Sequence, residues 1–440
     1  MLEQLISDDY RCIAASNQPM FRTDVDFDAE DRKRNDVIKE WVGLDPEQRA
    51  AFKKQADFET SKGVINLKDP AMLPARNYSL LSREAISRIS SSNDLRLLPL
   101  DGLNFDESIL ELAESIENVE DIRSLYKLRK KTTGQSDNAG INKDEALRLK
   151  NCFTQGRELY LAGKNGSLMV KPLNFFYALT AYTYGIIVLN NPLRFSKKNL
   201  PGSHGMSYLP DTIQAQFGGD SARGTFSDLV TSFPTHLIKT SSLEFQIDCR
   251  ESILDFYNRK FDVGLGMLLS MIPEMSDYYK LTTGSDSRCH SLSIVPENDP
   301  RMLRWEFQIG NGELRPTRKA VEESFPTFEI GERHGKIIVS VPAVDAHKIR
   351  ACIYTDIRGG LWFIENPFFP VLLPEIAIHF LANNIFSSVM RYRPDEWGSV
   401  LLNDVSSNLS LITRHYFSSF QRKFFVIVLR SISRYTPYVA

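Results

Sequence analysis

The sequence predicts an α+β protein that is predominantly helical, a multi-helix bundle into which a small antiparallel sheet is inserted. Three observations support this class. Residues 175–189 form a long apolar and aromatic run of helical length. Residues 373–434 space their apolar side chains as packed helices do. Residues 291–366 instead form short apolar runs separated by glycine-containing turns, which is typical of strands.

Bulk composition places the chain among ordinary globular proteins. Of its 440 residues, 42% are hydrophobic and 25% are charged, which is enough apolar material for a large core. The formal charge of -2 gives no overall attraction to nucleic acid or to anionic lipid. Five scattered cysteines without CxxC spacing argue against a disulfide framework and a zinc knuckle. Because the acidic start also does not fit a secretory signal, we expect a cytoplasmic protein.

Residues 1–137 are expected to form a separate, charged N-terminal helical section. Asp45-Pro-Glu47 is a good helix start, because aspartate caps free amides, proline suits the first turn and glutamate complements the helix dipole. Residues 106–131 then space their apolar side chains as a further helix. Residues 132–141 are polar, contain glycine and lack periodicity, so a linker is predicted there.

Residues 144–290 are expected to form the central helical part. Lys171-Pro172 can open the aromatic helix, since proline is tolerated in a first turn. The apolar run of this helix is shorter than the roughly 20 residues of a membrane span, which favours a buried helix. Residues 191–224 are rich in Gly, Ser and Pro and are predicted to be a functional or mobile loop. Residues 248–280 return to helix, with a break at Pro273.

Residues 291–366 are expected to form the small antiparallel sheet, and residues 367–440 a C-terminal helical layer. Apolar spacing predicts strands at residues 305–309, 336–341, 351–356 and 361–365, and helices at residues 373–390 and 406–434. Arg358-Gly-Gly360 suits a hairpin turn between the last two strands. The two helices are separated by a break at Arg391-Tyr-Arg-Pro-Asp-Glu-Trp397.

Four landmarks follow one another along the second part of the chain. They are Lys171-Pro172 with its aromatic helix, His204-Gly205, Met271-Ile-Pro-Glu-Met275 and Arg391-Tyr-Arg-Pro-Asp-Glu-Trp397. In this ordered set, residues 144–440 resemble the YaaC-like family of bacterial proteins. The resemblance implies a cytoplasmic, mostly helical protein, and the family has no settled activity. A fainter similarity is to HEPN-type helical domains, some of which are ribonucleases. None of the histidines in this chain follows an arginine at the spacing those nucleases use, which argues against that chemistry.

His204, Arg391, Arg393 and Glu396 are the candidate functional residues. His204 lies between glycines, so a ligand or another backbone segment can approach it closely. Its imidazole suits an acid, a base or an anion contact near neutral pH, or a structural contact that fixes the loop to a helix end. The two arginines suit a phosphate or the carboxylate of a partner. An intramolecular ion-pair network between two helices is the alternative.

Two further groups are weaker candidates. Arg315, Arg318 and Lys319 form a local basic patch that suits nucleic-acid phosphates, although neighbouring glutamates dilute it. Glu375 and His379 are spaced i,i+4, so they share a helix face as a metal or acid–base pair would, with a buried hydrogen-bonded pair as the alternative. No motif identifies a substrate, a metal or a cofactor.

Two classes of function follow. We expect a non-enzymatic cytoplasmic protein that binds a protein partner or a second copy of itself, with the aromatic helix as scaffold and polar loops as contact surface. No cofactor and no membrane contact are expected. The alternative is a nucleic-acid-binding protein, or a nuclease or effector in bacterial defence, that uses His204 with Arg391 or Arg393. Co-purified RNA would support the alternative, and clean protein that binds none in low salt would count against it.

Overall fold

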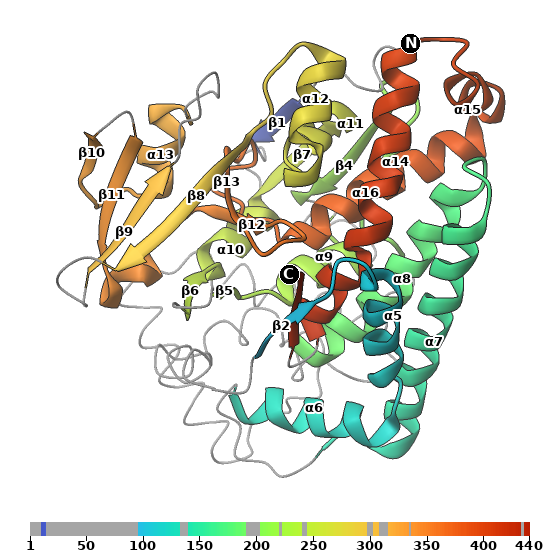
Figure 1. Ribbon diagram of the computed structural model, residues 1–440, viewed down its shortest axis with the longest axis horizontal. Coiled ribbons are helices and arrows are strands. Elements are labelled where there is room, and N and C mark those ends of the chain that lie inside the picture. The colour runs from blue at the N-terminus through green and yellow to red at the C-terminus, as the bar shows by residue number, and fades with distance from the viewer. Residues whose placement is uncertain are drawn as a thin grey trace, which may run out of the picture.

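The computed structural model describes residues 10–14, 96–132, 140–190, 203–219, 222–239, 244–296, 302–307, 316–333, 336–432 and 435–440. Within these residues the chain is a predominantly helical α+β protein, as predicted. Helices form the larger body, and a sheet reaches away from it to one side (Figure 1). The helix expected after Asp45 and most of the expected linker lie outside the described residues.

The helical body is built around α8 (Lys171–Asn190), whose side chains are mostly buried. The helices α7 (Lys143–Asn165), α14 (Glu375–Tyr392) and α16 (Ser407–Ile432) pack against it. Among the described residues, α8 alone is long and apolar enough to cross a membrane, but 78% of its apolar window is buried inside the protein, as in a core helix. The other helices of this body are α5 (Phe105–Ser115), α6 (Val119–Thr132), α9 (Thr225–Thr231) and α15 (Pro394–Leu401).

Local signals set the ends of these helices. The side chain of Asn142 caps α7 by accepting a hydrogen bond from the amide of Glu145 at 2.9 Å. Pro172 and Pro394 stand in the first turns of α8 and α15, where no amide donor is needed. Asn118 likewise accepts hydrogen bonds from the first amides of α6. The single helix predicted over residues 106–131 is therefore wrong, because a capped break separates α5 from α6.

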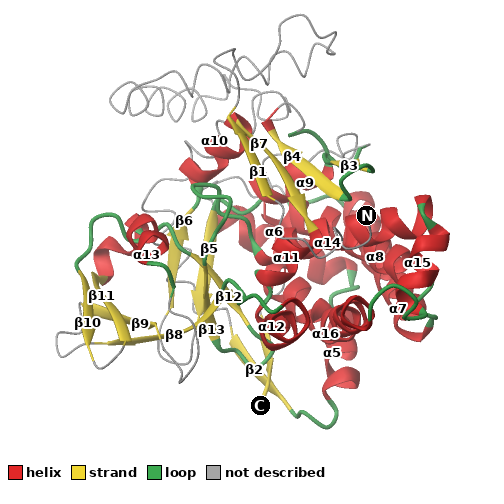
Figure 2. Cartoon of the chain, turned by 90° about the horizontal axis from the view of Figure 1, so that it is seen from above, coloured by secondary structure: helices red, strands yellow, loops and turns green. Residues whose placement is uncertain are grey.

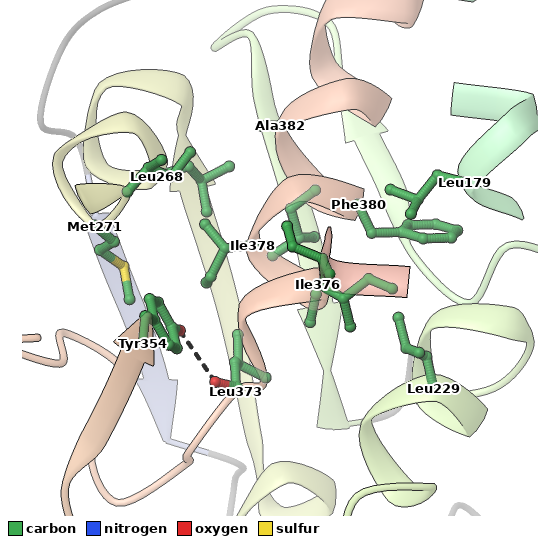
Figure 3. Packing of buried hydrophobic residues seen from close by; sticks show 14 of the residues in the cluster. Leu179, Leu229, Leu268, Met271, Tyr354, Leu373, Ile376, Ile378, Phe380 and Ala382 are labelled. Carbon is green, nitrogen blue, oxygen red and sulfur yellow. Dashed lines mark hydrogen bonds between the residues drawn. The ribbon is translucent and has the colours of Figure 1, made fainter. Parts of the chain in front are cut away.

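The start of α14 joins the helical body to the sheet that reaches away from it. Phe380 lies toward Leu179 of α8 (Figure 3), and both side chains are buried. The hydroxyl of Tyr354 donates to the carbonyl of Leu373 at 3.0 Å, immediately before α14 begins. The core is thus continuous from the helices into the sheet.

The larger sheet is antiparallel and has six strands in the order β10-β11-β9-β8-β13-β12. These strands are β8 (Cys289–Pro296), β9 (Met302–Phe307), β10 (Ile330–Arg333), β11 (Lys336–Pro342), β12 (Cys352–Thr355) and β13 (Leu361–Ile364). The four predicted strands correspond to β9, β11, β12 and β13, and the predicted hairpin turn contains Gly359 with a φ of 82°. The short helices α13 (Arg318–Ser324) and η5 (Ala343–Lys348) flank the sheet.

A second, four-stranded sheet corrects two predictions. Its order is β1-β7-β4-β3, with β1 (Tyr10–Ala14), β3 (Ser207–Leu209), β4 (Gln214–Gly218) and β7 (Arg259–Gly264). The section predicted as a long loop before residue 224 therefore contains β3 and β4. The helix predicted over residues 248–280 is interrupted by β7, which lies between two other strands and is largely buried, so it lacks the alternation that marks an exposed strand. The remaining elements of that section are α10 (Arg250–Asn258), α11 (Leu265–Ser270), η4 (Pro273–Met275) and α12 (Ser276–Thr283).

Two small strand pairs complete the fold. The parallel pair joins β2 (Arg96–Leu100) to β14 (Tyr435–Val439), and the antiparallel pair joins β5 (Thr235–Lys239) to β6 (Glu244–Asp248). β2, α5 and α6 belong to the section that the sequence predicts to be separate. Their buried side chains belong to the same hydrophobic cluster as α8 and α16, among them Leu100, Phe105, Ile109, Ala113 and Ile122.

Candidate functional site

The loop that carries His204 is fastened to the start of α9. The amides of Thr225 and Phe226 donate to the carbonyls of Ser203 and His204, each at 2.9 Å. The first amides of a helix have no acceptor within the helix, so the loop supplies the acceptors that α9 needs.

Two glycines make this close contact between backbone segments feasible. Gly205 has a φ of 71° and Gly224 a φ of 106°. A Cβ atom on Gly205 would lie 2.4 Å from the carbonyl oxygen of Arg223, and one on Gly224 would lie 2.5 Å from that of Ser203. The small residues around His204 therefore serve the contact between loop and helix, which is the structural alternative that the sequence left open.

The imidazole of His204 lies between α8 and the end of α14. Its ring meets the ring of Phe176 edge-on, with the centroids 5.1 Å apart. Burial, and then the nearby positive charge of Arg391, lower the pKa of His204, so the ring is neutral at pH 7. Its buried Nδ1 makes no hydrogen bond to a described residue. The fold thus brings His204 and Arg391 close together, with only the arginine charged.

Arg391 and Tyr392 form an exposed pair at the end of α14. Nε of Arg391 donates to the carbonyl of Ser387 at 3.1 Å, and its guanidinium carbon lies 4.9 Å from the ring centroid of Tyr392. A cation at this place is favoured by the negative end of the helix dipole. Tyr392 is 64% exposed, and its ring stacks on that of Tyr208 from β3 with a centroid distance of 6.3 Å.

Arg393 and Glu396 have a structural arrangement instead. The Nη1 atom of Arg393 lies 3.3 Å from Glu396, and its Nη2 donates to the carbonyl of Pro210 in the loop after β3. The buried indole of Trp397 donates to the carbonyl of Met169 at 3.1 Å. These bonds hold α15 against β3 and the start of α8. They match the intramolecular network that the sequence left open as the alternative to an anion-binding site.

The helix α15 lies at the edge of the molecule in both overall views (Figures 1 and 2). The guanidinium of Arg414 from α16 donates to the carbonyl of Leu401 and fixes the far end of α15. We define the α15 corner as Arg391 and Asp395 together with the exposed apolar side chains in or beside this helix, which are Met169, Val170, Tyr392, Leu402, Val405 and Leu411.

The second basic patch lies on α13, far from α15 in sequence. Nε of Arg318 lies 2.8 Å from Glu322, and Nζ of Lys319 lies 3.8 Å from Glu323. Arg315, the third residue of the predicted patch, lies outside the described residues. Because each described cation has a carboxylate one helical turn away, this patch has little net charge to offer a phosphate.

A buried charge cluster was not foreseen from the sequence. The side chain of Lys423 on α16 is 1% exposed. Its amino group lies 2.6 Å from Oε2 of Glu274 and also donates to Glu375. The predicted pairing of Glu375 with His379 is therefore wrong: Nδ1 of His379 faces the hydroxyl of Tyr416 at 3.4 Å. A buried ammonium group requires carboxylate partners, and Glu375 lies in the first turn of α14, where it reaches Lys423. A lone lysine among the phenylalanines of α16 was the signal that could have shown this.

The buried thiols of the core are not in the reactive thiolate form. Burial raises the pKa of Cys249 and Cys289, and it raises the pKa of Cys352 to about 12, so these thiols are protonated at neutral pH. In the part of the chain that the structure describes, no three His, Cys, Asp or Glu side chains come together as metal ligands would.

Comparison with known proteins gives one match. A family model described as YaaC-like Protein matches residues 114–432, more than half of the chain. The match begins inside α5, earlier than the resemblance seen in the sequence, and extends to the end of α16. No curated protein and no solved structure matches the chain.

Proposed function

The chain belongs to the YaaC-like protein family, and from the geometry of its α15 corner we propose that it is a protein-binding module without catalytic chemistry of its own. The α15 corner is the contact surface, and the helices around α8 are the scaffold that holds it.

The observation that carries this proposal is the exposure of Tyr392 between Arg391 and Tyr208. Tyrosine and arginine are the residues most enriched where protein interfaces concentrate their binding energy, together with tryptophan. At the α15 corner they stand beside exposed aliphatic side chains, of which Leu402 is 74% exposed. Clusters of exposed apolar side chains with a polar rim are typical of interaction sites.

Rigid support strengthens the proposal. The stack on Tyr208 restricts the ring of Tyr392, and Arg391 is fixed by its bonds to the last turns of α14. Beneath them, Trp397 packs on Phe386 with ring centroids 6.0 Å apart. A contact surface that is ordered before binding loses less conformational entropy when its partner docks.

The surroundings of His204 favour a supporting role. Its backbone is occupied in capping α9, and its imidazole is neutral and partly buried against Phe176. A charge–charge contact with an anion requires a protonated ring, which burial and Arg391 both oppose. We therefore assign His204 to the support of the α15 corner.

Site-specific photo-crosslinking tests the proposal. A photoreactive phenylalanine replaces Tyr392 in one variant and Leu281 in a control variant, because Leu281 on α12 is 68% exposed and lies away from α15 in sequence. In cells that make the chain at its native level, we expect a discrete protein adduct from position 392 and none from position 281. Equal adducts from both positions, or none from position 392, would refute the proposal.

Binding of single-stranded nucleic acid is the second candidate, because an exposed tyrosine beside an arginine also stacks on bases. Pairing of Arg318 and Lys319 with glutamates removes support from the other predicted contact patch. Fluorescence anisotropy with single-stranded RNA in low salt decides between the two. Salt-dependent binding that is lost in Arg391→Ala would replace our proposal, and no binding is what we expect.

A further inference from the structure

We propose that the partner at the α15 corner is a second copy of this chain, joined through a two-fold interface. This inference rests on the proposed function, since it names the occupant of the same surface. It is carried by the arrangement of charge on that surface.

The α15 corner carries one cation and one anion that are not engaged in ion pairs with described residues. Arg391 is exposed, and among the described residues its guanidinium donates to the carbonyl of Ser387 and the hydroxyl of Ser388. Asp395 is exposed in the first turn of α15, where the helix dipole stabilises its charge. Of the charges next to them, Arg393 pairs with Glu396.

This pattern is self-complementary. In a two-fold interface, a residue that contacts a second residue of the other copy is itself matched by the reverse contact. Arg391 would meet Asp395 of the second copy, and Asp395 would meet Arg391 of the second copy. The two ion pairs would enclose Tyr392 and its apolar neighbours, which lie beside the same helix.

The helix dipoles favour these two charges where they stand, and an unrelated partner need not use both of them. A second copy uses both, because the same surface must supply both halves of each contact. The exposed apolar side chains would be buried against their own counterparts, leaving charged groups at the rim, as in stable protein interfaces.

Sedimentation velocity of the full chain, with charge-reversal variants, tests the inference. We expect the wild type to form a dimer, and Arg391→Asp or Asp395→Arg to weaken it by about tenfold or more, because each turns two attractive contacts into repulsive ones. The double variant should regain the dimer. Lys319→Asp, an exposed charge reversal on α13, is the matched control and should dimerise as the wild type does.

Mixing the two single variants gives the sharpest result. Arg391→Asp has two anions at the corner and Asp395→Arg has two cations, so the mixture should form a heterodimer although each variant alone stays monomeric. A wild type that remains monomeric, or a mixture that does not associate, overturns the self-association. Adducts from position 392 with another protein would then leave the proposed function standing, whereas the absence of any adduct would remove both.

Discussion

Lys423 links three elements of the core through buried ion pairs. Its ammonium group is held by Glu274 from η4 and by Glu375 from α14, and the amide of Ile357 donates to the other oxygen of Glu274 at 3.0 Å. Nearby carboxylates raise the pKa of Lys423 although burial opposes this, so the lysine stays charged. Removing one partner from such a group leaves uncompensated buried charge, which costs far more than the intact group contributes.

Lys423→Met should therefore destabilise the chain strongly, by about 3–5 kcal/mol in the free energy of unfolding. The variant keeps the volume of the side chain but leaves two carboxylates without their cation. Lys319→Met is the matched control, because Lys319 is 83% exposed, and it should change stability by less than about 0.5 kcal/mol. Urea unfolding followed by circular dichroism measures both. Similar midpoints for the two variants would contradict this account of the charge cluster.

His236 gives a prediction for acid pH. Burial lowers its pKa to about 4, whereas the unfolded chain takes up this proton near pH 6.5. Between these values the unfolded state binds more protons, so the folded state loses stability as the pH falls, by about 3 kcal/mol at pH 4. His236→Gln lacks this loss. Unfolding midpoints measured from pH 7 to pH 4 should fall more steeply for the wild type, and parallel curves would show that the burial of His236 is not coupled to folding.

At the scale of elements, α7 and α8 interlock through glycines that face aromatic rings. A Cβ atom on Gly156 would lie 2.7 Å from the ring of Tyr182, and one on Gly185 would lie 2.0 Å from the ring of Phe153. The rings of Phe153 and Tyr182 are themselves stacked, with centroids 5.5 Å apart. Rings from each helix thus fill the space left by glycines on the other, which fixes the antiparallel register of the pair.

Gly185→Ala should destabilise the chain, because the added methyl group must displace the ring of Phe153. We expect a loss of about 1–3 kcal/mol from overpacking. Gly398→Ala is the control, since a Cβ atom there meets nothing within 4 Å inside α15, and it should be neutral or stabilising by up to about 1 kcal/mol. Thermal unfolding of both variants checks this. A destabilised Gly398→Ala beside an unchanged Gly185→Ala would contradict the interlocked register.

Elements with local signals were predictable from the sequence. Pro172 indicated the start of α8, and Gly359 indicated the hairpin between β12 and β13. The strand β7 was not predictable, because it is largely buried and follows α10 directly, so neither its periodicity nor a turn marks it. The break at Asn118 was missed because apolar spacing continued across it.

At the scale of the molecule, the pairings that close the fold join distant parts of the chain. β1 pairs with β7, and β2 pairs with β14 at the other end of the sequence. The spacing of apolar residues within a short segment cannot predict which distant strand that segment pairs with. The same limit applies to the candidate site. The sequence identified His204 and Arg391 but not Tyr392, because only the fold sets Tyr208 against Tyr392 and places Met169 beside Trp397.

If the α15 corner is a protein-binding surface, it is covered by protein in the cell. Hydroxyl-radical footprinting of the chain in cell extract, compared with the purified chain at high dilution, tests this most directly. We predict that Tyr392 and Met169 are protected in the extract, while Leu281 is labelled equally in both samples. Equal labelling of Tyr392 in the two samples, or protection of Leu281 in its place, would show that the α15 corner is not a binding surface.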